Sequence, residues 1–287
     1  MAAVDPTSID WAIARHATYR VCQSFRYDYT EPITDLNHRL VVIPPERFGD
    51  QRRIYHDLLV ELKEVRLHNR SDQFGNVVVD VFAPKVPEAI EFVAEVLVER
   101  SAAEPNILAG GWPPEDWLLD PSPLTAPDNR IQAAAEELAA GAEYGLELAD
   151  RINDWVYGAM TYRHEVTSVR TTAAEALAFG SGVCQDFAHV MIAVARACGL
   201  PSRYVSGHMV GQGGTHAWVE VVLPAAGGHD SIAWAFDPTH ASRVGLGYVT
   251  IAVGRDYSDV APTSGYYRSG GSGRLTTTKQ VTLTDLS

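Results

Sequence analysis

The order of polar and apolar positions divides the chain into a strand-like first part and a helical middle part. Polar and apolar residues alternate from Ala17 to about Phe82, a period typical of strands with one buried face. Turn-forming residues interrupt the alternation, which favours several short strands. Because no helical spacing intervenes, we expect a β-sandwich or meander here. The alternating segments are residues 17–29, 36–45, 54–70 and 76–84.

Residues 101–127 are rich in proline and tryptophan and follow neither period. We interpret them as an ordered linker that runs over the surface. The domain boundary is therefore expected here. An N-terminal β-rich domain is predicted at residues 1–110 and a second domain at residues 111–287.

Apolar residues recur every three or four positions after this linker. Helices are predicted over 128–140 and 146–162, and a short helix is predicted to begin at Thr172, which is spaced from Glu175 as in a capping box. A further helix follows the sequence GSGVC at residues 180–184. Gly199 is suited to the residue after its last turn, and Pro201 prevents its continuation.

The period returns to two after Pro201. Three short strands are predicted at residues 203–210, 216–224 and 231–239, and glycine-bearing links between them indicate antiparallel hairpins. A last strand is predicted at residues 275–286. Helices followed by an antiparallel sheet predict an α+β fold for the second part of the chain.

Composition narrows the classes of function. The 287 residues are 46% hydrophobic, and 23 basic against 36 acidic side chains give a net charge of −13. This charge repels phosphate backbones, so we expect no nucleic-acid partner. No run of 18 apolar residues and no signal peptide are visible, so we expect no membrane contact. Three cysteines are too few for a disulfide framework, which indicates the cytoplasm.

Cys184 is a candidate nucleophile because of its place at the start of a helix. The first turn of a helix has unpaired N–H groups and about half a positive charge, which stabilise a thiolate and an oxyanion. The glycines before Cys184 allow a substrate backbone to come close. A single cysteine at such a place is more often structural, so this position alone does not establish catalysis.

His216 and Asp237 are the candidate base and orienting acid. His216 begins one predicted strand and Asp237 ends the next. If the hairpin closes at Leu223 and Asp230, its register places His216 directly opposite Asp237. An imidazole held by a carboxylate is the base that a cysteine nucleophile needs. Each of these residues also has an ordinary structural interpretation, as an exposed histidine or a turn.

Metal and cofactor sites are not predicted. The nearby cysteine and histidines lack the close paired spacing of zinc ligands, and no phosphate-binding glycine motif lies between a strand and a helix. We therefore expect no metal and no cofactor. The candidate ligands in this part of the chain are Cys184, His189, His208, His216 and His240.

The segments GSGVCQDFAHV, ACGLPSRYVSGH, HAWVEVVLP and AWAFDPTH occur in an order that resembles the transglutaminase-like superfamily of papain-like cysteine enzymes. The resemblance covers about residues 150–262. The opening HATYRVCQSFRYDYTEPI resembles the N-terminal region of bacterial members. The resemblance to the superfamily implies a papain-like core of helices on an antiparallel sheet. It also implies a triad in which Cys184 is the nucleophile, His216 the base and Asp237 the acid.

Three further residues are expected at the site, to bind the oxyanion or to form its wall: Gln185, Trp155 and Tyr162. The expected function is amide hydrolysis, by a peptidase or amidase that acts on a peptide or protein amide through a thioester. Two alternatives remain open at this point. A transglutaminase would pass a glutaminyl acyl group to an amine, and a binding module would keep the fold without catalysis.

Overall fold

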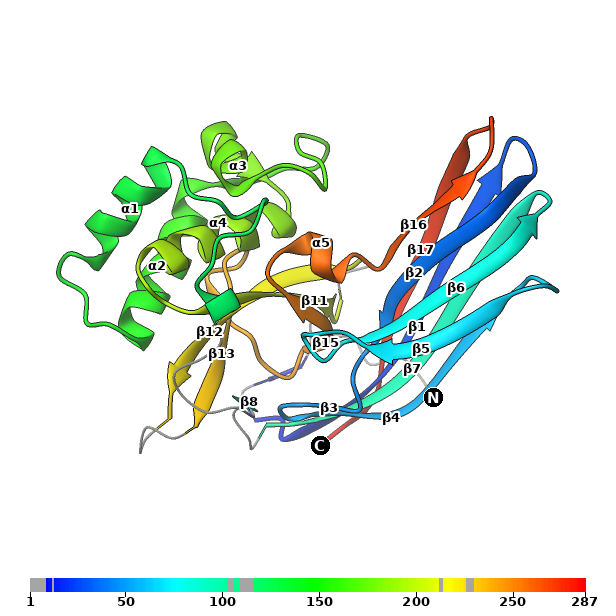
Figure 1. The fold of residues 1–287 in the computed structure, drawn as a ribbon. Coiled ribbons are helices and arrows are strands. Elements are labelled where there is room, and N and C mark those ends of the chain that lie inside the picture. The colour runs from blue at the N-terminus through cyan, green and yellow to red at the C-terminus, as the bar shows by residue number, and fades with distance from the viewer. Residues whose placement is uncertain (1–8, 12, 103–105, 109–115, 212–213, 226–229) are drawn as a thin grey trace.

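A β-sandwich and a helical lobe with its own sheet lie side by side (Figure 1). The computed structural model describes residues 9–11, 13–102, 106–108, 116–211, 214–225 and 230–287. Within these residues the chain is α+β, with a strand-rich N-terminal part, as the sequence predicted. The expected domain boundary between residues 110 and 111 lies outside the described residues.

Two antiparallel sheets form the sandwich. Alternation along the first strand explains its burial, since Tyr19, Val21 and Phe25 are buried while Arg20 and Arg26 are exposed. The first sheet has the order β17 (Gly273–Leu286), β1 (His16–Tyr29), β7 (Ala89–Ser101), β4 (Gln51–Val60) and β3 (Arg47–Phe48). The second has the order β16 (Thr263–Arg268), β2 (Ile33–Ile43), β6 (Val77–Val86) and β5 (Arg66–Ser71).

The C-terminal strands belong to this sandwich. β17 pairs with β1 along its whole length, and β16 pairs with β2. The sequence predicted residues 263–286 within the second domain. In the structure they instead add one strand to each sheet of the N-terminal sandwich. The alternating segment 54–70 also differs from expectation, because it forms β4 and β5, two strands in different sheets.

The second part of the chain packs helices on one face of a sheet. Ala217, Val219 and Val221 of β12 face α4 and share its core. The helices are α1 (Asn129–Ala139), α2 (Leu146–Ala159), α3 (Ala173–Phe179), α4 (Cys184–Ala197) and α5 (Tyr257–Val260). The sheet has the order β14 (Ser242–Arg243), β13 (Ser231–Asp237), β12 (His216–Pro224), β11 (Ser202–Met209) and β15 (Tyr248–Gly254), and β8 (Asn106–Leu108) pairs with β13. Thr161–Tyr162 (β9) and Ser181–Gly182 (β10) form a short parallel pair.

The helix predicted after GSGVC is α4, and nearly all of its residues are buried. It ends as the sequence indicated, because Gly199 has a φ of +76° and its N–H bonds to the carbonyl of Arg196. The capping box of Thr172 and Glu175 is also present at the start of α3. Apolar patterning thus fixes α4 at the centre of the lobe, with its N-terminus at the candidate site.

Buried side-chain amides join the sandwich to the lobe. Gln51 donates to the carbonyl of Thr250 at 2.8 Å and accepts from the same residue's N–H at 2.9 Å. Asn76 makes the same pair of bonds with Val253, at 2.7 and 2.8 Å. Each amide pairs with β15 as another strand would. No helix in the described part of the chain has the length and apolar character needed to cross a membrane.

Candidate active site

Cys184 is the first residue of α4, and a buried carboxylate holds this end of the helix in place. Asp186 accepts from the N–H of Val183 at 2.8 Å and from the hydroxyl of Thr167 at 2.6 Å. A Cβ added at Gly182 would lie 2.5 to 2.7 Å from the Asp186 side chain. The glycine before Val183 therefore serves close packing against this carboxylate, and the half-buried thiol stays at the helix terminus.

His216 and Asp237 meet, but not through the expected register. Val219 pairs with Phe236 and Pro224 with Ser231, so the register is shifted by two residues from the one that the sequence predicted. A shift of two keeps both side chains on the same face of the sheet. They are diagonal neighbours, and their length spans the gap: Nε2 of His216 donates to Oδ2 of Asp237 at 2.7 Å.

Asp237 is fully buried and accepts four hydrogen bonds. Oδ2 receives His216, Nδ1 of His240 at 2.8 Å and the Tyr248 hydroxyl at 2.8 Å. Oδ1 receives the N–H of Thr239 at 2.9 Å. So many donors stabilise the ionised form, and they hold the pKa of Asp237 far below its ordinary value in spite of burial. The carboxylate is therefore negative at neutral pH.

The imidazole of His216 lies between this carboxylate and the thiol of Cys184. Burial alone would favour the neutral ring. Hydrogen bonds to Asp237 and to Cys184 outweigh that cost and raise the pKa of His216 to about 9. Because Asp237 engages Nε2, Nδ1 is the nitrogen left for the sulfur. The three residues of the predicted triad are thus in contact as a chain of acid, base and thiol.

The three expected accessory residues differ in their placement. Gln185 follows the thiol in α4 and is buried. Tyr162 lies on β9, is 44% exposed and is close enough to Cys184 for their charges to interact. Trp155 belongs to α2, is partly buried and packs against the core of the lobe. Gln185 and Tyr162 are therefore positioned beside the thiol, whereas the described contacts of Trp155 are with the core.

Sequence reasoning did not single out Asp186, Thr239 or Tyr248. Asp186 had a signal, because an acidic residue three positions after the N-cap is typical of a capped helix. Tyr248 had none, since only tertiary packing brings the start of β15 to Asp237. His240 was considered only as a metal ligand, and its contact with Asp237 follows from the tight turn after β13.

His216, Asp237 and His240 also offer ligand atoms within 4.8 Å of one another. Their separations of 2.7 and 2.8 Å are hydrogen-bond lengths. A tetrahedral zinc ion with bonds of about 2.0 Å would hold its ligand atoms about 3.3 Å apart. The direct hydrogen bonds therefore account for this cluster as it stands, and we derive no metal chemistry from it.

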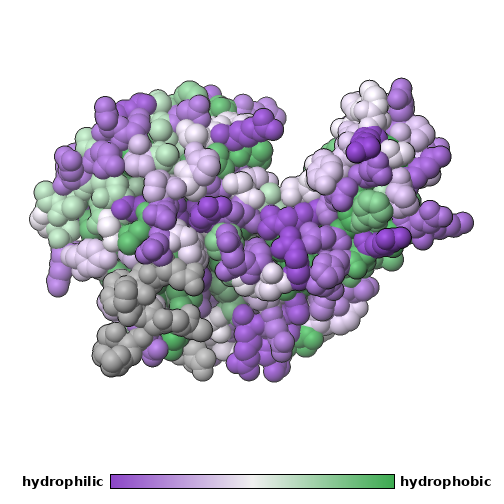
Figure 2. Space-filling view, in the orientation of Figure 1, coloured by the Kyte–Doolittle hydropathy of each residue, from purple (hydrophilic) through white to green (hydrophobic). Residues whose placement is uncertain are grey.

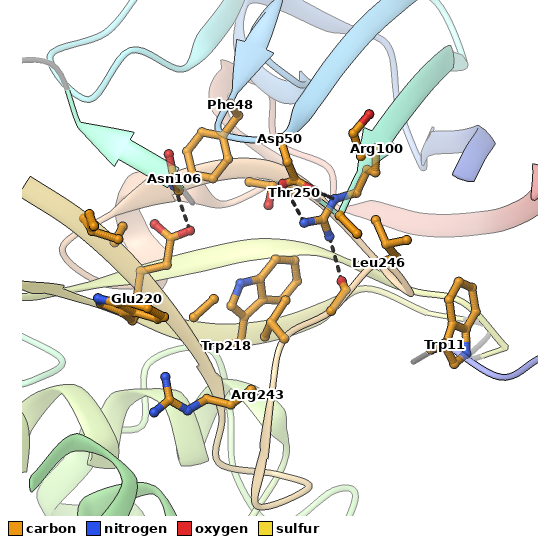
Figure 3. Close-up of a pocket in the computed structure, with 18 of the residues that line it drawn as sticks. Trp11, Phe48, Asp50, Arg100, Asn106, Trp218, Glu220, Arg243, Leu246 and Thr250 are labelled. Atoms are coloured by element: carbon orange, nitrogen blue, oxygen red, sulfur yellow. Dashed lines mark hydrogen bonds and ion pairs between the residues drawn. The ribbon is translucent and has the colours of Figure 1, made fainter. Parts of the chain in front are cut away.

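A separate pocket of about 370 Å³ lies on the face of the sheet away from α4 (Figure 3). Trp218 and Glu220 of β12 point into it, and Arg100 and Asp50 close it from the sandwich side. Trp218 stacks on His216, with ring centroids 6.3 Å apart, so this wall supports the imidazole from behind. Cys184 does not line the pocket.

Two family models match the chain. Residues 132–236 match the transglutaminase-like superfamily, and residues 19–99 match the bacterial transglutaminase-like N-terminal region. The first contains Cys184 and His216 and ends at Phe236, directly before Asp237. The first match lies within the lobe and the second within the sandwich.

Relatives and a solved structure extend over nearly the whole chain. An uncharacterised protein of Mycobacterium leprae is 28% identical over 284 residues, which is 92% of this chain and 98% of the relative. One of Mycobacterium tuberculosis is 29% identical over 278 residues, 86% of each chain. A crystal structure of a "putative cysteine protease" from Cytophaga hutchinsonii superposes with a TM-score of 0.75 at 22% identity, over 94% of this chain and 91% of the other. This last similarity is one of fold.

Proposed function

The chain belongs to the transglutaminase-like superfamily, and from this premise we propose that it is a cysteine-dependent amide hydrolase, a peptidase or amidase. One observation carries the proposal: His216 is hydrogen-bonded to Asp237 on one side and to Cys184 on the other. A thiol beside a carboxylate-held imidazole is the arrangement that nucleophilic acyl transfer requires.

In the proposed reaction, His216 takes the proton of Cys184 and the sulfur attacks the amide carbonyl carbon. The first N–H groups of α4 have no acceptor within the helix, so they can bind the oxyanion. Gln185 and Tyr162 lie beside them. The imidazolium then gives its proton to the leaving amine as the C–N bond breaks. This leaves a thioester on Cys184.

Water completes the cycle. His216, again neutral, takes a proton from the water as its oxygen attacks the thioester, and the C–S bond breaks to release a carboxylic acid and the thiol. Asp237 stays ionised throughout and holds Nε2, so that Nδ1 faces the sulfur. The thiols of Cys22, Cys184 and Cys198 are free. The proposal includes a reducing compartment such as the cytoplasm, where Cys184 stays reduced.

A covalent trap tests the proposal most directly. The full chain is incubated with a panel of peptide and glutaminyl amides, and the acyl adduct is sought by intact mass. We expect a mass increase at Cys184 and release of the amine, both lost in Cys184→Ala. Incorporation of an added amine instead of hydrolysis would identify a transglutaminase. Folded protein with neither adduct nor turnover, and with Cys184 alkylated no faster than free cysteine, would contradict catalysis.

A further inference from the structure

Lys279 lies on the inner face of β17, where the sandwich meets the lobe. It pairs with buried Gln23 of β1, and paired residues point to the same face of a sheet. In the same row, Val281 packs against the core of the lobe and Leu283 is buried, whereas Leu275 is 44% exposed. Lys279 therefore lies where the inner face of β17 changes from buried residues to solvent-exposed ones.

The open part of this face borders a hollow in the molecular surface. Figure 2 shows the hollow between the helical lobe and the arm that carries β16 and β17. Lys279 belongs to the arm and Cys184 to the lobe, and the two groups are close enough for their charges to interact. The C-terminal strand thus brings a cation to the candidate nucleophile across the boundary between the two parts.

The ammonium of Lys279 has a hydroxyl and an aromatic ring as neighbours. Nζ lies 3.4 Å from Oγ1 of Thr215, the residue before His216, and 5.6 Å from the centroid of the Phe25 ring. Within the described part of the chain, no carboxylate forms an ion pair with it. The side chain is half-buried, and burial lowers the pKa of its ammonium.

Such a cation is unusual in a chain with a net charge of −13, in which acidic partners are abundant. Lysines are seldom buried without a partner, because a desolvated charge is costly. The other two lysines, Lys63 and Lys85, are exposed. A half-buried ammonium near the candidate nucleophile, with no ion pair among the described residues, is complementary to an anion that arrives with the substrate.

We propose that Lys279 binds a carboxylate of the substrate, so that the enzyme selects amides with a carboxylate close to the bond that Cys184 attacks. This carboxylate belongs either to an acidic side chain or to a free C-terminus. The assignment rests on the proposed function of Cys184. The first experiment is nevertheless independent of amide hydrolysis.

The rates of Cys184 alkylation by iodoacetate and by iodoacetamide are measured on the full chain. The reagents deliver similar groups, but only iodoacetate is anionic, so the ratio of the two rates cancels changes in thiolate reactivity. In Lys279→Met we expect this ratio to fall about fivefold, the change that one charge pair about 4 Å apart in water corresponds to. Lys279→Arg is expected to keep the ratio within about twofold, and so is Lys85→Met, which removes an exposed charge on β6.

An unchanged ratio in Lys279→Met would overturn the proposal, even if both rates fell, because Lys279 would then act only on the thiolate. The same holds for an equal fall of the ratio in Lys85→Met, which would indicate net charge as the cause. A ratio that falls in Lys279→Met alone supports anion binding whether or not amides are hydrolysed. Absence of turnover together with that result would contradict the hydrolase and leave the anion site in place.

Matched substrates then separate the two sources of the carboxylate. Peptide amides that differ only as glutamate against glutamine test a side chain, and free acid against C-terminal amide tests a terminus. For one pair we expect a higher kcat/KM for the charged member, carried mainly by KM and lost in Lys279→Met. Equal kcat/KM within both pairs for the wild type would exclude a carboxylate-selective enzyme.

Discussion

The side chains of His216 and Asp237 meet diagonally across β12 and β13, with Nε2 and Oδ2 2.7 Å apart. Neither residue lies opposite the other in the strand register. The same Oδ2 also accepts from His240 and Tyr248. One carboxylate oxygen therefore sets the orientation of the imidazole, and three donors from three segments require that this oxygen be an acceptor.

Asp237→Asn is expected to lower turnover by about 10²- to 10⁴-fold, the range seen when a triad carboxylate is made neutral. The asparagine NH₂ group cannot accept from the donors that converge there, and its amide does not stabilise an imidazolium. Hydrolysis of a peptide amide and alkylation of Cys184 by iodoacetamide measure the effect. His240→Ala is the control, because it removes one donor to Oδ2 of Asp237 and leaves the charge of the Asp237 carboxylate in place. A fall of less than tenfold is expected for it, and wild-type rates in Asp237→Asn would contradict the triad.

The raised pKa of His216 predicts how stability depends on pH. The folded state holds this proton more tightly than the unfolded state, whose pKa is near 6.5, because the pKa in the fold is about 9. The stabilisation is therefore fully present below about pH 6.5 and is lost as pH rises through about 9, with a size on the order of 3 kcal/mol. Urea unfolding of the wild type and of His216→Gln from pH 6 to 10 measures it.

The difference between these two proteins in free energy of unfolding is expected to shrink across that range. A constant difference would mean that His216 has an ordinary pKa in the fold. The same titration predicts a fall of kcat/KM above about pH 9, because neutral His216 has no proton for the leaving amine. For a substrate whose leaving group needs no proton, such as an activated ester, we expect no such fall of kcat/KM above about pH 9.

The elements that carry the triad could be predicted from sequence because their signals are local. Helical spacing and Gly199 define α4, and alternation defines β12 and β13. A register error of two residues leaves each side chain on the same face of the sheet, so the sequence predicts the contact of His216 with Asp237 although the predicted register differs by two from the observed one. Patterns of period two indicate which face a residue occupies more reliably than which residue it opposes.

Long-range pairing could not be predicted in the same way. The strand at the C-terminus was expected from its alternation, but nothing local in its residues says that it pairs with β1, whose paired residues lie 244 to 269 positions earlier. For this reason Lys279 had no place in the sequence-based site. Tyr248 was missed for a similar reason, because the hydroxyl reaches Asp237 only through the packing of β15 beside β11.

Gly182→Ala is expected to destabilise the chain by about 1–3 kcal/mol, because its Cβ would overlap the Asp186 side chain that caps α4. Displacing that carboxylate moves the start of the helix, so alkylation of Cys184 should also slow. Gly158→Ala in α2 is the matched control, since a Cβ there meets nothing within 4 Å. It should stabilise the chain by about 0.5–1 kcal/mol through helix propensity. Equal stability of the two variants would show that Gly182 is not needed for close packing.

Asn76→Ala tests how the sandwich is held to the lobe. The substitution leaves the N–H and the carbonyl of Val253 buried without the amide that satisfies both. Each unpaired buried group costs about 1–3 kcal/mol, so we expect a loss of about 2–4 kcal/mol in the free energy of unfolding, measured by urea denaturation.

Asn37→Ala is the control for this change. Asn37 is half-buried and donates to the carbonyl of Asp35 within its own strand, so a loss below about 1 kcal/mol is expected. Asn76→Ala should also slow alkylation of Cys184 by iodoacetate more than by iodoacetamide, because β15 links the sandwich that carries Lys279 to the lobe that carries the thiol. A stability within about 0.5 kcal/mol of wild type would mean that the amide pairing with β15 does not hold the two parts together.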